Sequence, residues 1–247
     1  MNDSLQRVLA YAQDLDPGFK GAIEGAFPQE ISELESLLGR PLPESYRVFL
    51  ERMGRQLDWL EPGGSGRFDL SVSTVLAYYR AENWLPSYAY IRIGSAIDGS
   101  RRHPHLALGS GEPTVIEFPG CTRDMFVKTV ALHSETLAGS LTEWIAEPIF
   151  RMRELEAPSR RARAWLYGRY APDLLLAVSA QLSAQGFELL WFSNSAGQYL
   201  VRPGAGARAT AIPHLGVVIE ISADEESVCR GLSLDIQNTH RLSAHPL

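Results

Sequence analysis

The sequence predicts an α+β protein, in which an antiparallel sheet flanked by N- and C-terminal helices is followed by a smaller helix-plus-antiparallel-sheet domain. Two patterns support this class. Apolar residues recur at helical spacing over residues 5–53, and beyond them short alternating segments are separated by turns rich in Gly and Pro. A second helix followed by strands is expected after residue 158. A chain of 247 residues is long enough for two domains of ordinary size.

Three amphipathic helices are predicted near the N-terminus. The first follows Ser4, a residue type that caps helices. The second begins at Pro28, where the missing N–H is tolerated, and stops at Gly39. The third begins behind Pro43 and ends near Gly54. The apolar positions that recur at spacings of three and four are Leu5, Val8, Leu9, Ala12, Ile31, Leu34, Leu37, Leu38, Tyr46, Phe49, Leu50 and Met53.

The pattern then changes to the period of two that is typical of strands. Turn signals at 98–99, 109–111 and 119–120 separate the segments, so we expect one antiparallel sheet. A helix capped by Ser134 and bent at Pro148 closes this part. The expected elements are a strand over 68–72, a helix over 74–79, strands over 89–93, 106–108 and 114–118, and the closing helix over 134–152.

A polar, proline-containing stretch at 156–161 predicts a domain boundary, with domains over 1–158 and 159–247. The first holds 22 acidic and 15 basic residues, a net charge of −7, and the second holds 7 acidic and 8 basic residues, a net charge of +1. In the second we expect a helix over a sheet of about four strands. Its expected elements are a helix over 174–182 closed by Gly186, a hairpin of 187–192 with 198–202, strands over 215–221 and 228–236, and a turn at 203–206.

The composition excludes several classes of function. A formal net charge of −6 gives no electrostatic footprint for nucleic acid and is repelled by an anionic membrane surface. No apolar run approaches the roughly 20 residues that span a bilayer, and the N-terminus lacks the basic start and apolar block of a signal peptide, so we expect a cytoplasmic protein. The isolated Cys121 and Cys229 favour small buried side chains over a disulfide framework.

Residues 31–54 carry the most informative motif. Its landmarks, in order, are Leu34-Glu35, Gly39, Leu42-Pro43, Tyr46, Phe49-Leu50 and Gly54. This order resembles the N-terminal signature of the SUKH superfamily. The turn Asp98-Gly99 resembles the acidic, glycine-containing turn in the middle of that domain, and residues 141–150 resemble its closing helix. The resemblance extends from about residue 20 to residue 155, and residues 159–247 carry no motif of this kind.

The resemblance implies a compact α+β domain that binds proteins and does not catalyse a reaction. Members most often act as immunity proteins that neutralise a secreted bacterial toxin, and elsewhere as regulators of cell-wall assembly. We therefore expect an immunity protein that binds a cognate toxin directly, with no cofactor, no metal and no catalytic residue. The alternative without catalysis is an intracellular regulatory or scaffold module, whose second domain supplies another binding surface.

The segment His103-Pro104-His105 is the main candidate for chemistry. Its two imidazoles are potential metal ligands, but no third ligand stands at a suitable spacing, which favours a solvated loop. Asp98 and His103 could pair as an acid–base couple, which would make the protein an enzyme. The sequence offers no nucleophile motif beside them, and this favours a polar turn.

Acidic and aromatic residues in the loops of the first part provide candidates for partner binding. Carboxylates beside large aromatic side chains suit the capture of a basic protein such as a nuclease-type toxin, whose substrate channel is positively charged. The competing interpretation is a solvated surface with two core tryptophans. The candidate partner-binding residues are Asp58, Trp59, Glu61, Asp69, Glu82, Trp84 and Asp98.

Overall fold

The computed structural model describes residues 3–15, 17–57, 67–81, 89–100, 102–109, 111–119, 134–157, 159–169, 173–212 and 216–244. In these ranges the chain is an α+β protein with seven α-helices and several antiparallel sheets, as the sequence predicts. Its residues group into two compact units, Met1–Pro148 and Ile149–Leu247. The boundary predicted between residues 158 and 159 falls inside the second unit. No described helix is long and apolar enough to cross a membrane.

The three predicted N-terminal helices are confirmed, but the first already begins at Asp3, so Ser4 lies inside it and is not its cap. Pro28 opens the second helix, and Gly39 closes it with a φ of 67°, a left-handed conformation that costs glycine little. Ser71 caps the fourth helix through its side chain, which accepts a hydrogen bond from the Thr74 backbone N–H. Val72 therefore lies in this helix, whereas the sequence pattern predicts it at the end of a strand. The helices are α1 (Asp3–Leu15), the 3-10 helix η1 (Pro17–Ala22), α2 (Pro28–Leu38), α3 (Glu44–Met53) and α4 (Val72–Arg80).

The connection between α2 and α3 is fixed by one carboxylate. Oε1 of Glu35 accepts a hydrogen bond of 2.8 Å from the Leu42 backbone N–H and also bonds the Arg47 guanidinium. The backbone N–H of Arg40 donates to the Glu35 carbonyl, which closes the end of α2. A charge-assisted bond to a backbone N–H is stronger than a neutral one, so Glu35 sets the path from one helix to the next.

The apolar residues of this helical hairpin form part of the core. Tyr46, Phe49 and Leu50 are each at most 1% exposed, and burying a side chain of this size contributes about 1.5–3 kcal/mol to folding. Gly54 follows α3 at a point of close approach. A Cβ atom there would lie 2.6 Å from the Leu50 carbonyl oxygen and 3.0 Å from the Ala26 methyl group, so only glycine fits.

The described residues of the first unit form three small antiparallel sheets. The predicted strands over 89–93, 106–108 and 114–118 are confirmed as neighbours in one sheet of order β4-β6-β7-β8. The strand expected at 68–72 is shorter and pairs elsewhere, with β5. The strands are β1 (Ile23–Glu24) with β2 (Gln56–Leu57), β3 (Phe68–Asp69) with β5 (Ser95–Ala96), and β4 (Tyr90–Arg92), β6 (Arg102–Ala107), β7 (Thr114–Pro119) and β8 (Glu135–Ala138).

Two expectations in this region are wrong. The sequence favours a solvated loop for His103 and His105, but they lie within β6, where His105 is only 5% exposed. The predicted start of the closing helix at Ser134 is also incorrect, because β8 occupies residues 135–138. The helix α6 (Leu141–Phe150) begins after Ser140, whose hydroxyl accepts a hydrogen bond of 3.0 Å from the Glu143 N–H and so supplies the N-cap. Pro148 lies inside α6, which continues into the π-helical turn η2 (Arg151–Leu155).

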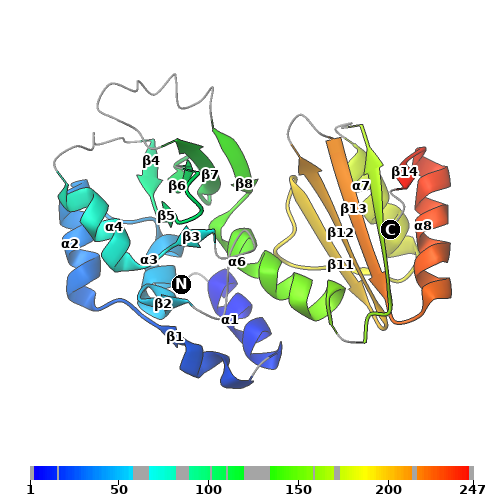
Figure 1. The fold of residues 1–247 in the computed structure, drawn as a ribbon, viewed down its shortest axis with the longest axis horizontal. Helices are drawn as coiled ribbons and strands as arrows, with labels where there is room; N and C mark the ends of the chain where they lie inside the picture. The colour runs from blue at the N-terminus through cyan, green and yellow to red at the C-terminus, as the bar shows by residue number, and fades with distance from the viewer. Residues whose placement is uncertain are drawn as a thin grey trace. The chain divides into compact units, whose positions relative to one another are not determined.

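The described residues of the second unit form a six-stranded antiparallel sheet of order β10-β11-β12-β13-β9-β14, with two helices on one face (Figure 1). The helix α7 packs on β11 and β12, and α8 packs on β9 and β13. Apolar side chains from both helices and four strands form one buried cluster between them. The elements are β9 (Ala162–Gly168), α7 (Leu174–Ala184), β10 (Glu188–Leu189), β11 (Gly197–Arg202), β12 (Ala205–Ile212), β13 (Gly216–Ala223), α8 (Glu226–His240) and β14 (Ser243–Ala244).

The sequence predictions for this unit are correct in part. The helix closed by Gly186 and the hairpin are confirmed. The turn expected at 203–206 is confirmed only at 203–204, because Ala205 and Gly206 already belong to β12. The strand expected over 228–236 is wrong, because these residues belong to α8. There Cys229, Leu232 and Ile236 recur at spacings of three and four toward the core, while Leu234 is 50% exposed. The sequence pattern does not predict strands β9, β12 and β14, so the sheet formed by the described residues has six strands rather than the expected four or so.

The opposite face of this sheet receives the segment that follows α6. The Ser222 hydroxyl on β13 donates a hydrogen bond of 2.8 Å to the Leu155 carbonyl. On the neighbouring strand, a Cβ at Gly206 would lie 2.7 Å from the Glu154 carbonyl oxygen. The turn η2 therefore lies directly on the sheet, and the absence of a side chain at Gly206 allows the approach.

Candidate functional site

The structure describes two of the predicted partner-binding residues, Asp69 and Asp98. Both belong to the small sheet formed by β3 and β5 and its adjoining turn, in which Asp69 is opposite Ser95 and Phe68 is opposite Ala96. Asp98 lies in the turn that follows β5, so the sheet brings these two carboxylates into one region of the first unit. The other five candidates lie outside the described residues, namely Asp58, Trp59, Glu61, Glu82 and Trp84.

Asp69 has an internal role. Its carboxylate accepts a hydrogen bond of 2.9 Å from the Ser71 N–H and one of 2.5 Å from the Thr74 hydroxyl, at the start of α4. Partial burial raises the pKa of Asp69, but the bonds from Thr74 and Ser71 outweigh it and hold the pKa below its ordinary value. The negative charge also suits a helix N-terminus. Asp69 therefore orders the junction of β3 and α4, and this use of its oxygens weakens the case for partner contact.

Asp98 is exposed and ionised. One of its oxygens accepts a hydrogen bond of 2.9 Å from the Ser100 N–H, and the other accepts one of 2.9 Å from Nε of Arg67. The bonds from Ser100, followed by the Arg67 contact, lower the pKa of Asp98 to about 2. Gly99 adopts a φ of 78°, which closes the turn. The carboxylate is thus held in a fixed position with its charge intact.

A buried glutamate connects this turn to the larger sheet. Glu117 on β7 has a side chain only 3% exposed and forms ion pairs of 3.0 Å with both Arg67 and Arg102. Arg102 also approaches Glu135 on β8 at 3.8 Å. Because Arg67 bonds Asp98 as well, the charges alternate in sign from the sheet interior to the surface turn. A buried carboxylate paired with two guanidinium groups avoids the large cost of an isolated charge.

The histidines of β6 support the turn and the sheet. Nδ1 of His103 accepts a hydrogen bond of 3.0 Å from the Ala96 N–H, and burial followed by the nearby Arg92 lowers its pKa to about 4. The His105 ring stacks on Phe118 with centroids 3.7 Å apart. Burial lowers the pKa of His105 to about 3. Both rings are therefore neutral near pH 7, and His103 acts as an acceptor that holds the backbone leading into the turn.

The described residues offer neither a metal site nor a reactive thiol. Within these ranges, no group of three or more His, Cys, Asp or Glu side chains is arranged to hold a metal ion. Cys229 is buried in α8, where desolvation raises the pKa of its thiol above the ordinary value and keeps it protonated. Cys121 lies outside the described residues.

Sequence reasoning missed the residues that organise this site, Arg67, Arg102 and Glu117. A signal for Glu117 was present. It shares its face of β7 with Val115, which is fully buried, and a charged residue at a core-facing position of an apolar strand indicates a buried ion pair. The identity of its partners depends on the pairing of β6 with β7 and on the position of β3, which the sequence pattern does not encode.

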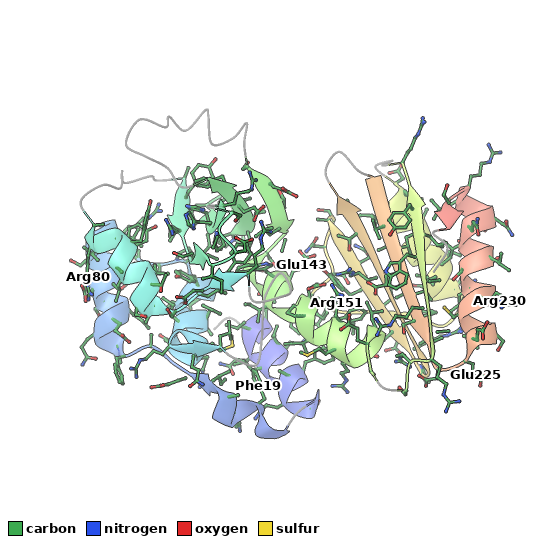
Figure 2. The ribbon with its side chains drawn as sticks, viewed as in Figure 1. Phe19, Arg80, Glu143, Arg151, Glu225 and Arg230 are labelled. Carbon is green, nitrogen blue, oxygen red and sulfur yellow. The ribbon has the colours of Figure 1, made fainter. Side chains whose placement is uncertain are left out.

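The ion pair that joins α4 to α2 in the first unit is more exposed than the network around Glu117. Arg80 at the end of α4, labelled in Figure 2, forms two hydrogen bonds of 2.7 and 2.8 Å with Glu33 of α2. The side chains are 56% and 41% exposed, so solvent screens this pair. The network around Glu117 is therefore the better-shielded charge arrangement of the two.

Comparison with known proteins identifies no relative, because neither the protein-family models nor the curated proteins contain a match to this chain.

Proposed function

We propose that this protein is a non-enzymatic binding protein that neutralises a cognate secreted toxin by direct contact, as an immunity protein of the SUKH type. The supporting observation is how the motif residues pack. Leu34, Tyr46 and Phe49 are buried, Glu35 fixes the connector, and Gly54 allows the close approach that follows. These residues all serve packing and chain geometry, as expected of a motif that marks a fold. The function of the protein then depends on its surface features.

The mode of inhibition follows from charge. The first 148 residues carry 20 acidic and 13 basic residues, a net charge of −7. Such a surface attracts a basic partner over a distance and accelerates association, and the attraction weakens as salt is added. A nuclease-type toxin fits this description, since its substrate is itself negatively charged. Occupation of the toxin's substrate channel needs no cofactor and no reaction by the immunity protein.

The test begins with affinity capture of the full-length tagged protein from the cells that produce it, at moderate salt. We expect one large partner in near-equal amount. Its C-terminal domain, expressed alone, should kill the host, and co-expression of this protein should restore growth. Capture of several housekeeping or envelope proteins, with no rescue from toxicity, would contradict the proposal and favour the regulatory or scaffold module.

The enzymatic alternative is separated by a double substitution, Asp98→Ala with His103→Ala. If the protein acts by stoichiometric binding, loss of rescue should be accompanied by a proportional loss of affinity for the toxin. Loss of rescue with the fold and the affinity intact would instead indicate a reaction at this turn. The single variant Glu33→Ala, on a distant exposed ion pair, is the matched control.

A further inference from the structure

The strand β10 forms an open edge of the sheet in the second unit. Among the described residues it pairs only with β11, and it stands at the end of the strand order. The Leu190 N–H donates to the Tyr199 carbonyl at 2.8 Å, so the backbone groups of residue 190 face β11. Because these groups alternate in direction along a strand, the N–H and the carbonyl of Leu189 point away from β11. An edge of this kind is a template for another strand.

The Leu189 side chain adds an apolar contact to this edge. Leu189 lies directly opposite Leu200, and residues opposite each other project from the same face of a sheet. Leu200 belongs to the buried cluster between the sheet and its two helices. Leu189 therefore projects toward the helix side as well, where it is 50% exposed. A strand that pairs with β10 would cover this leucine.

The helix α7 borders the same edge and carries no charged side chain from Leu174 to Ala184. Gln181 and Gln185 bond Asp235 of α8, which identifies the side of α7 that faces α8. Leu176 stands nine residues before Gln185, about two and a half helical turns, so it lies on the opposite side, toward β10. It is 62% exposed. A helix without charge on any side is normally covered all round, and this side of α7 is open in the single chain.

Two-fold symmetry allows a second copy to cover both features. When two β10 strands pair antiparallel about an axis at Leu189, the two Leu189 residues exchange both of their outward N–H···O=C bonds. Their side chains then lie next to each other on the side that carries the α7 helices. Glu188 falls opposite Leu190 of the other copy, so the two Glu188 carboxylates do not face each other. An uncharged contact also suits self-association of a chain with a net charge of −6, because two acidic surfaces repel.

We propose that this protein forms a symmetric homodimer in which the β10 strands of two copies pair about Leu189 and join their sheets, with Leu176 and Leu189 covered at the contact. The inference goes beyond the proposed function and does not depend on it. The dimer contact uses residues of the second unit, whereas the proposed toxin contact uses the acidic surface of the first.

The first experiment measures the mass of the full-length protein in solution by sedimentation equilibrium over a series of concentrations. We expect the wild type to reach twice the mass of the chain. Leu189→Lys puts two ammonium groups next to each other at the axis. Because a symmetric dimer carries each substitution twice, the dissociation constant should rise at least about a hundredfold. A wild type that stays monomeric, or a Leu189→Lys variant that dimerises like the wild type, would overturn the inference.

Leu234→Lys is the matched control. Leu234 is also a leucine 50% exposed in the second unit, but it lies in α8, which packs on β9 and β13 rather than on the β10 edge. This variant should dimerise as the wild type does. Both substitutions are at exposed positions, so circular dichroism and the melting temperature of dilute, monomeric samples should be unchanged. Equal loss of the dimer in both variants would contradict a contact at β10.

The second experiment tests the position of the two-fold axis. The Cα atoms of a pair that exchanges both backbone bonds lie about 5.5 Å apart, which a disulfide can span. On mild oxidation, Leu189→Cys should therefore give a covalent dimer, and Leu234→Cys should give no more than the wild type, which retains Cys121 and Cys229. Absence of a covalent dimer from Leu189→Cys, or an equal yield from Leu234→Cys, would refute the pairing of β10 with its copy.

Discussion

Each unit contains a shielded charge network, and the two differ in what they join. In the first unit, Glu117 binds two arginines, and one of these reaches Asp98 in an exposed turn. In the second, Arg160 is 8% exposed and pairs with Glu154 at 3.1 Å and Asp224 at 2.7 Å, which ties η2 to the end of β13. The first network positions a surface feature, whereas the second holds the scaffold together. Similar ion pairs therefore position an exposed turn in the first unit and hold segments of the scaffold together in the second.

The largest expected effect is from Glu117→Ala. Removing this carboxylate leaves Arg67 and Arg102 without their shared buried anion, and breaking a buried ion pair costs about 3–5 kcal/mol. Urea unfolding with hydrogen exchange read separately for each unit should show the loss in the first unit only. The control Glu33→Ala removes an exposed pair that solvent screens, and should leave the stability nearly unchanged. A Glu117→Ala protein as stable as this control would show that the network is not a structural element.

The next effect is a dependence of stability on pH. The pKa of His103 is about 4 and that of His105 is about 3, both below the ordinary 6.5, so the native state binds fewer protons than the unfolded state. Their contribution is complete above pH 6.5 and is lost as the pH falls toward these values. For His105, which is buried, the loss by pH 4 should be on the order of 3 kcal/mol.

Denaturant unfolding at a series of pH values checks this dependence. The variant His105→Asn lacks a titrating ring but retains a donor for the His103 carbonyl. It should start less stable at pH 7 and lose less stability on acidification. A slope as steep as that of the wild type would assign the pH dependence to other groups.

A smaller loss of stability is expected in the second unit from a substitution at a close backbone contact rather than at a charged group. Gly206→Ala would place a Cβ 2.7 Å from the Glu154 carbonyl, a backbone atom that must move aside. Overpacking of this kind costs about 1–3 kcal/mol. Hydrogen exchange should show the loss in the second unit. The control Gly231→Ala adds a methyl group to the exposed side of α8, where nothing lies within 4 Å, and should be neutral or stabilising. Similar stability of both variants would contradict the close packing of η2.

The smallest effect concerns the connector of the motif. Glu35→Ala removes the acceptor of the Leu42 N–H and the partner of Arg47, and hydrogen bonds to charged groups contribute about 1.5–3 kcal/mol when well shielded. Because the Glu35 side chain is 21% exposed, solvent screening reduces this contribution, and we expect a loss below that range, about 1 kcal/mol. Thermal unfolding should show this loss. The substitution Glu44→Ala, at an exposed position of the next helix, should leave the melting temperature unchanged.

The parts of the fold that could be predicted are the elements whose ends are marked by proline or glycine in the sequence. Pro28 and Gly39 mark the ends of α2 because backbone sterics act within a few residues. The strand β12 escaped prediction because its core positions Ala205, Ala207 and Ala209 are small, and their fit depends on α7 packing over them. In α8, Leu232, Leu234 and Ile236 alternate as in a strand, and only the tertiary core selects the helix.

The candidate site could be predicted only for its acidic turn. Asp98 and Gly99 are recognisable from the sequence as a polar turn, and this is confirmed. The pairing of Arg67 with Glu117 joins residues 50 positions apart, so it depends on sheet register rather than on any local pattern.

The position of η2 also limits where a recombination crossover can fall if the resulting chimaera is to remain functional. The sheet of the second unit contacts Leu155 through Ser222 and leaves room for Glu154 at Gly206. A recombination crossover at residue 158 would deliver that sheet without the segment that covers it, whereas a crossover before Ile149 would deliver both together. Functional chimaeras should therefore inherit residues 149–157 from the same parent as the sheet, even though the chain at that point is a helix begun in the first unit.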